Sequence, residues 1–284
     1  WTATFTPTGN HESTGNTIVV GTSYTDLAGN TGGSGTSNTY AIDTKAPTIT
    51  GITSDTADGS YSATQTVNVI VTFSEAVTLD GGNLVVTLDT GGTVTIETIS
   101  ESTTASGTYT IGAAQTTADL SAASVALSGG TLSDASPFSN PMTSFTGYTD
   151  ISAASAIVID TTAPTVSSVV MADANIDIDD TSLLTITFSE AVTAFANADL
   201  TIGNGTLTAV ASADGGVTWT ATFTPTGNHE STGNTIVVGT TWTDIAGNAY
   251  GGVAVSSNAY AIDTKAPTIT GITSDTADGS YIAT

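Results

Sequence analysis

The chain of 284 residues contains no cysteine and no arginine, and its only strong bases are two lysines. Without cysteine, neither a disulfide framework nor a thiolate metal site can form. Against the two lysines stand 26 acidic residues, which give a formal net charge of −24. So few cations cannot neutralise nucleic-acid phosphates, and an anionic membrane surface would repel the chain. The composition therefore argues against nucleic acid and anionic membranes as partners.

Long apolar runs are also missing. No run approaches the roughly 20 residues of a membrane-spanning helix, so we expect no membrane insertion. The hydrophobic residues, 39% of the chain, instead alternate with polar ones, as in Val67, Val69, Val71 and Phe73, and in Leu184, Ile186 and Phe188. Alternation of β-branched residues between Gly-, Asn- and Asp-rich turns is typical of strands. The sequence therefore predicts an all-β chain with little helix.

The most informative feature present is a repeat. Residues 1–22 and 219–240 are identical, and AIDTKAPTITGITSDTADGSY runs from Ala41 and again from Ala261. Lys45 recurs as Lys265, which gives a period of about 220 residues. Repeats of such fidelity multiply length, which suits a spacer better than an enzyme.

A fainter repeat divides this unit in two. IDTKAPTITGI, from Ile42, resembles IDTTAPTVSSV, from Ile159, and VTFSEAV, from Val71, resembles ITFSEAV, from Ile186. We therefore predict two complete modules, 44–160 and 161–263, each near the roughly 100 residues of an immunoglobulin-type β-sandwich. Residues 1–43 would be the C-terminal strands of a partial module, and 264–284 the start of a further one.

Seven strands are expected in the second complete module, at residues 165–171, 183–188, 200–203, 206–212, 217–225, 235–239 and 254–262. Gly203-Asn204-Gly205-Thr206 predicts a tight hairpin turn with positive φ. His229 is interpreted as a solvated residue of a polar loop.

These motifs resemble those of a known family. FSEAV after an alternating strand, DGGVTWTATFTP, TDIAGN and the IDTxAP linker are similar to bacterial immunoglobulin-like tandem repeats, which build the stalks of giant biofilm adhesins of the repeats-in-toxin type. The resemblance implies Ig-like β-sandwich modules arranged end to end. The 44–160 module resembles a sister class with the motif D-A-A-G-N, of which Asp134-Ala135-Ser136-Pro137 is a degenerate copy.

Carboxylates gather at the expected module ends. An up-and-down trace places linker residue Asp160 with loop residues Glu190, Asp214 and Asp244, opposite Asp55 and Asp58 of the preceding module. The equivalent upstream set is Asp43, Glu75 and Asp134. The downstream set is Asp263 with some of Asp173, Asp177, Asp179 and Asp180. Converging carboxylates repel one another unless a cation binds, and Ca²⁺ suits oxygen-rich surroundings without cysteine. The alternative is that these aspartates only shape turns.

Two functions remain open at this point. The first is a structural extender of an extracellular bacterial adhesin or surface fibre, stiffened by Ca²⁺ at its junctions. Its partners would be neighbouring modules of the same chain, with lateral self-association left open. The alternative is an array of glycan- or ice-binding modules, or a surface-layer component. We expect no enzyme, because each repeat has one isolated histidine and no nucleophile motif.

Overall fold

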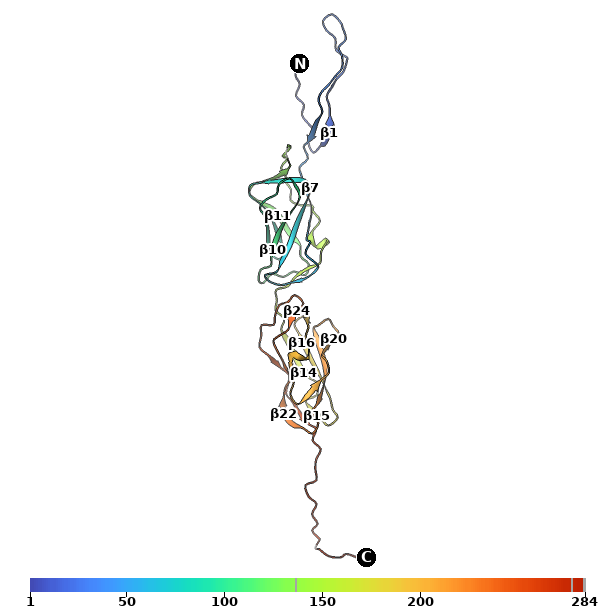
Figure 1. The fold of residues 1–284 in the computed structure, drawn as a ribbon, viewed down its shortest axis with the longest axis vertical. Coiled ribbons are helices and arrows are strands. Elements are labelled where there is room, and N and C mark those ends of the chain that lie inside the picture. The colour runs from blue at the N-terminus through green and yellow to red at the C-terminus, as the bar shows by residue number, and fades with distance from the viewer. Residues whose placement is uncertain (136, 277, 283–284) are drawn as a thin grey trace. The chain divides into compact units, whose positions relative to one another are not determined.

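The computed structural model describes residues 1–135, 137–276 and 278–282 as two compact units, Trp1–Thr162 and Ala163–Thr284 (Figure 1). Among these residues the only helical elements are two 3₁₀ turns, η1 (Ile151–Ala153) and η2 (Asn197–Asp199). The all-β prediction is confirmed. None of the described residues forms a helix that is long and apolar enough to span a bilayer.

Strands β1 to β13 make up the first unit. Their bounds are β1 Glu12–Asn16, β2 Val19–Val20, β3 Gly35–Thr36, β4 Tyr40–Asp43, β5 Ile49–Thr53, β6 Gly59–Tyr61, β7 Thr66–Asp80, β8 Asn83–Leu88, β9 Thr93–Ile96, β10 Ser102–Thr110, β11 Ala122–Ser128, β12 Thr131–Asp134 and β13 Ile157–Ile159. One sheet has the order β10-β7-β12, with β5 also on β7, and another has the order β11-β8-β9. β13 pairs with β6 in parallel, and β1 pairs with β4.

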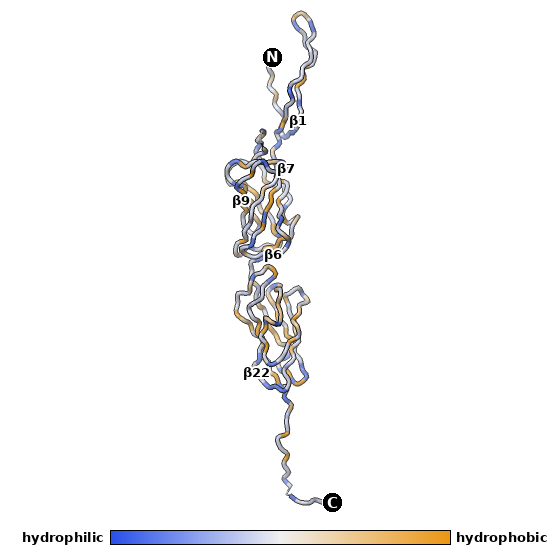
Figure 2. The backbone as a smooth tube through the Cα atoms, viewed as in Figure 1, coloured by the Kyte–Doolittle hydropathy of each residue, from blue (hydrophilic) through white to orange (hydrophobic). Residues whose placement is uncertain are grey.

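The core of the first unit comes from residues 49–159. Val67, Val69 and Val71 of β7 are fully buried, and so are Leu84 and Val86 of β8. These alternate positions face the opposing sheet, as the period-2 pattern predicts. Figure 2 shows hydrophobic residues spread along the strands, interspersed with polar ones. Residues 1–43 contribute no member of this core.

Residues 1–43 expose side chains that their repeat buries. Phe5 is 54% exposed, whereas Phe223 at the equivalent position is 0% exposed. Val20 and Val238 differ in the same way, at 54% and 0%. In the second unit, residues 163–218 supply the strands that cover these positions. Burial at these sites therefore depends on partner strands rather than on the local sequence.

Strands β14 to β26 make up the second unit. Their bounds are β14 Val166–Met171, β15 Asn175–Asp177, β16 Ser182–Phe188, β17 Val192–Thr193, β18 Leu200–Thr201, β19 Gly205–Leu207, β20 Ala211–Ser212, β21 Thr218–Pro225, β22 Glu230–Asn234, β23 Val237–Val238, β24 Thr243–Asp244, β25 Val255–Ser256 and β26 Tyr260–Asp263. The largest sheet has the order β14-β16-β21-β19, with β20 on β21. Smaller sheets have the orders β15-β26-β22 and β18-β23-β25, and β17 pairs with β24.

Two local predictions in this unit need correction. Asn204 has the predicted positive φ, 56°, but β18 and β19 on either side pair with β23 and β21 and not with each other. The turn therefore passes from one sheet to another and closes no hairpin. The polar segment after His229 is strand β22, which pairs with β26, and His229 is half-buried rather than solvated.

The tail after Asp263 illustrates the same dependence on partners. Among the described residues of 264–284 there is no strand, although residues 264–281 repeat 44–61. In the first unit this sequence forms β5, which pairs with β7. The tail has no such partner, and its Ile269 and Ile272 are exposed.

Candidate metal centre

Three predicted ligands meet in the first unit. One carboxylate oxygen from each of Asp43, Glu75 and Asp134 lies within 4.8 Å of the other two. Oxygens bound to one Ca²⁺ at about 2.4 Å are at most about 4.8 Å apart. We call these three residues the carboxylate cluster. Its separations are compatible with one shared calcium ion.

Three separate strands position the cluster. Asp43 is the last residue of β4, and Asp134 is the last residue of β12. Asp134 pairs with Val77 of β7. Glu75 lies in β7 itself, where the register with β10 jumps from Thr72 to Val77. A bulge of this kind turns a side chain out of the regular alternation, and here it accompanies the approach of Glu75 to the other two carboxylates.

Asn140 holds Asp134 in place. Its backbone N–H donates to Asp134 Oδ1 at 2.5 Å, and its side-chain Nδ2 donates to Oδ2 at 2.6 Å. The same Nδ2 lies 3.2 Å from the backbone oxygen of Asp43. Asp134 is only 3% exposed, so these bonds satisfy a carboxylate that would otherwise be costly to bury.

This contact revises the interpretation of the degenerate motif. Residues 134–137 lack an asparagine, but Asn140, farther along the loop, donates hydrogen bonds to both carboxylate oxygens of Asp134. Ser136 lies outside the described residues. The same bidentate arrangement, which we call the Asp–Asn clamp, joins Asn30 to Asp26 and Asn248 to Asp244. The pKa of Asp26 is lowered, chiefly by the side-chain hydrogen bond from Asn30.

The electrostatics of the cluster are those of crowded negative charge. Partial burial raises the pKa of Glu75, and the charges of Asp43, Asp134 and Glu12 raise it further. Lys45 acts in the opposite direction. A carboxylate with a raised pKa among like charges is a group that a bound cation would stabilise in its ionised form.

Two members of these surroundings, Glu12 and Asn140, were not predicted from the sequence. Glu12 is brought close by strand pairing, because it lies opposite Asp43 in the β1–β4 ladder. Its segment, Glu12–Asn16, is polar and has no alternating pattern that would have revealed a strand. Lys45 donates its backbone N–H to Asp43 Oδ1 at 3.0 Å, which fixes the start of the linker.

Three other predicted ligands accept hydrogen bonds from neighbouring protein groups. Asp55 accepts a hydrogen bond from Asn68 Nδ2 at 2.9 Å, and Asp58 accepts one from the backbone N–H of Ala156 at 2.8 Å. Asp214 accepts from Thr218 N at 2.9 Å and Ser212 Oγ at 2.8 Å. The backbone bond from Thr218 is the main cause that lowers the pKa of Asp214 to about 2. The contacts of Asp214 are the local ones expected of a turn-forming aspartate, whereas those of Asp55 and Asp58 connect segments that lie apart in the sequence.

The remaining predicted ligands belong to different units. Asp160 follows β13 in the first unit and accepts a hydrogen bond from Thr162 N at 2.9 Å. In the second unit, Glu190 precedes β17, and Asp244 lies opposite Val192 of that strand. The set formed by Asp160, Glu190 and Asp244 stays a prediction. Asp263 lies opposite Glu230, as Asp43 lies opposite Glu12.

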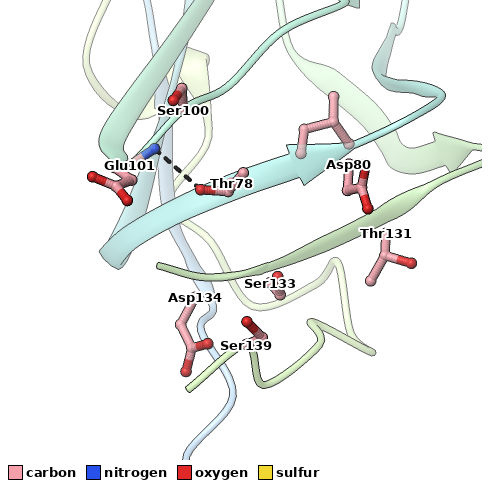
Figure 3. Close-up of a pocket in the computed structure, with 9 residues that line it drawn as sticks. Thr78, Asp80, Ser100, Glu101, Thr131, Ser133, Asp134 and Ser139 are labelled. Atoms are coloured by element: carbon pink, nitrogen blue, oxygen red, sulfur yellow. Dashed lines mark hydrogen bonds between the residues drawn. The ribbon is translucent and has the colours of Figure 1, made fainter. Parts of the chain in front are cut away.

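A pocket of about 510 Å³ opens beside Asp134. Hydroxyl and carboxylate side chains dominate its lining, with Asp134 and Ser139 at one edge (Figure 3). The backbone N–H of Glu101 donates to Thr78 Oγ1 at 3.2 Å across another edge. None of the described residues that line this pocket is aromatic, so it offers no ring on which a sugar could stack.

A family profile described as bacterial Ig-like domain matches residues 1–42 and 160–262, which together make up about half of the chain. The first matched segment, residues 1–42, repeats the C-terminal part of the second matched segment. Among curated proteins, none matches this chain.

Proposed function

The chain belongs to the bacterial Ig-like domain family, and from that premise we propose that it is a structural extender. It forms part of the stalk of an extracellular bacterial adhesin or surface fibre, with no catalytic activity of its own. Ca²⁺ binds at its module junctions and stiffens them. The carboxylate cluster of Asp43, Glu75 and Asp134 is the observation that carries this proposal.

The chemistry of the cluster favours calcium over other cations. All three side chains offer only carboxylate oxygens, which are the ligands that hard cations prefer. Zinc sites commonly use cysteine or histidine, and this group contains neither. One Ca²⁺ together with the nearby Lys45 would offset the charges of the three ionised carboxylates, and Glu12 adds one further negative charge to the surroundings. Six to eight oxygens are needed in total, so water or further protein oxygens complete the shell.

The position of the cluster explains how an ion would stiffen the chain. Asp43 ends β4, just before the linker, whereas Glu75 and Asp134 belong to strands that follow it. The linker also contains Pro47, which is buried and restricts the residue before it to extended backbone. An ion shared by the three carboxylates would connect the strands on both sides of the linker. Rotation about the linker would then require breaking metal–oxygen bonds.

The distribution of special residues supports an extender over a recognition array. A binding array should repeat an exposed aromatic or apolar face on each module. Here the acidic residues converge at the linker, and in the second unit Trp242 and Tyr260 are buried and Trp219 is half-buried. The pocket near Asp134 is polar and open. These features suit a rod whose function lies in its junctions.

Calcium titration by isothermal calorimetry tests the proposal. The full chain should bind Ca²⁺, and Glu75→Gln should lower the stoichiometry by one ion, because it removes a central charged ligand. Glu97→Gln is the matched control, since Glu97 is exposed and outside the cluster, and it should leave binding unchanged. Equal stoichiometry and affinity in the wild type and the Glu75→Gln variant would rule out calcium at this cluster.

A further inference from the structure

A loop of the first unit borders a pocket beside the carboxylate cluster. Phe138, in the loop after β12, lines a pocket of about 220 Å³ together with Pro7, Tyr40, Ile42 and Thr44. Phe138 is 40% exposed. Among the described strands, β4 pairs with β1 alone. The junction therefore contains an aromatic side chain in addition to its carboxylates.

The second unit presents the repeated version of this surface. Pro225 and Thr264 repeat Pro7 and Thr44. Here β26 has a second neighbour, β15, with Asp177 opposite Asp263. Ile178 directly follows Asp177 in the sequence, and it lines pockets together with Thr264. It borders two pockets, one of about 320 Å³ with Pro225 and Thr264, and one of about 250 Å³ that extends to the linker.

Ile178 is 60% exposed, although it is a large apolar residue beside a linker. The chain after Asp263 repeats the linker that follows Asp43, including Lys265 and Pro267 at the positions of Lys45 and Pro47. In the first unit this linker leads to the module that carries Phe138. An identical linker favours the same placement of the module that follows it.

We propose that Ile178 packs against Phe138 of a second copy of the 44–160 module placed after residue 263. The contact is an apolar clasp beside the metal ligands. It fills the hollow bordered by Ile178, Pro225 and Thr264, and it removes apolar surface from water on both modules. This packing and a bound calcium ion would have different effects. The ion would restrain the distance between the two modules, whereas the packed side chains would restrain their rotation about the linker. The proposal rests on the tandem arrangement but not on calcium.

Cross-linking in a lengthened chain tests the clasp. The full chain is extended in frame after Thr284, which repeats Thr64, by a second copy of residues 65–162. Cysteine replaces Ile178 and, in the added copy only, Phe138. Because the natural sequence contains no cysteine, a short bis-maleimide can join only these two positions. We expect intramolecular cross-linking at least about tenfold faster than in the control, because packed residues have a high effective concentration.

The control pair combines Val170→Cys with the same substitution in the added copy. Val170 is 45% exposed and lies in β14 of the same unit, so its thiol is accessible but away from the linker. Both pairs are measured in calcium and in chelator. Faster reaction of the Ile178 pair in either condition supports the clasp, whatever calorimetry shows about calcium. Equal rates of the two pairs in both conditions would overturn it.

Discussion

Asn140→Ala is expected to destabilise the first unit by about 2 kcal/mol, because it leaves an oxygen of a buried carboxylate without its donor. Asp134 is 3% exposed, and Asn140 Nδ2 is the donor to its Oδ2. Alanine retains the backbone N–H that donates to Oδ1 but removes the side-chain amide. For a unit of this size, the loss corresponds to a melting temperature lower by roughly 4–8 °C. Differential scanning calorimetry of the full chain measures it.

Asn30→Ala provides the matched control, because it removes the same clamp contact in a solvent-exposed setting. Asn30 donates to Asp26 with the same two groups, but both residues are exposed, and water can replace the lost donor. The expected change is below about 0.5 kcal/mol. If the two variants lose equal stability, or if Asn140→Ala is neutral, burial of Asp134 does not depend on its clamp.

Glu75→Gln should change the stability of the first unit in opposite directions with and without calcium. In chelator the variant should melt at a higher temperature than the wild type, because it removes one of several repelling charges. In calcium at a hundredfold excess over Kd, binding adds about 2.7 kcal/mol to the wild type, or roughly 5–10 °C. The variant loses most of that gain. Glu97→Gln should follow the wild type in both conditions.

The pH dependence of this difference has a defined sign. The pKa of Glu75 is raised by partial burial and by neighbouring carboxylates, so between its unfolded and folded pKa values the folded state binds more protons. Unfolding free energy therefore falls as pH rises through that interval. In chelator the advantage of Glu75→Gln should be absent below pH ~4.5 and grow as pH rises above it. An advantage that is constant with pH would mean that charge repulsion is not its cause.

The carboxylate cluster could be predicted because loop order and linker position determine which ends of strands meet. Asp43, Glu75 and Asp134 come together as the trace predicts. Glu12 and Asn140 could not be predicted in the same way. Glu12 reaches the site through the register of a polar strand, and Asn140 lies farther along its loop than the motif places it. The first depends on pairing between segments distant in sequence, and the second on the path of the loop after β12, and local pattern encodes neither.

The strands were predictable where burial imposes alternation and less so elsewhere. β16 and β21 follow the apolar period closely, because every second side chain faces the core. β22 is polar and β15 is short, and each is held by pairing with β26. Residues 1–43 and 219–263 show the same principle within one chain. Nearly the same sequence is exposed in the first segment and buried in the second, because only the second has the strands that cover it.

The most direct test of the calcium-bound junction is a crystal structure of the full chain grown with calcium, with ions assigned by anomalous scattering at long wavelength. We predict an anomalous peak within about 2.6 Å of a carboxylate oxygen from each of Asp43, Glu75 and Asp134. A well-ordered cluster with no anomalous peak at saturating calcium, its charges separated or bridged only by water, would contradict a junction that calcium stiffens.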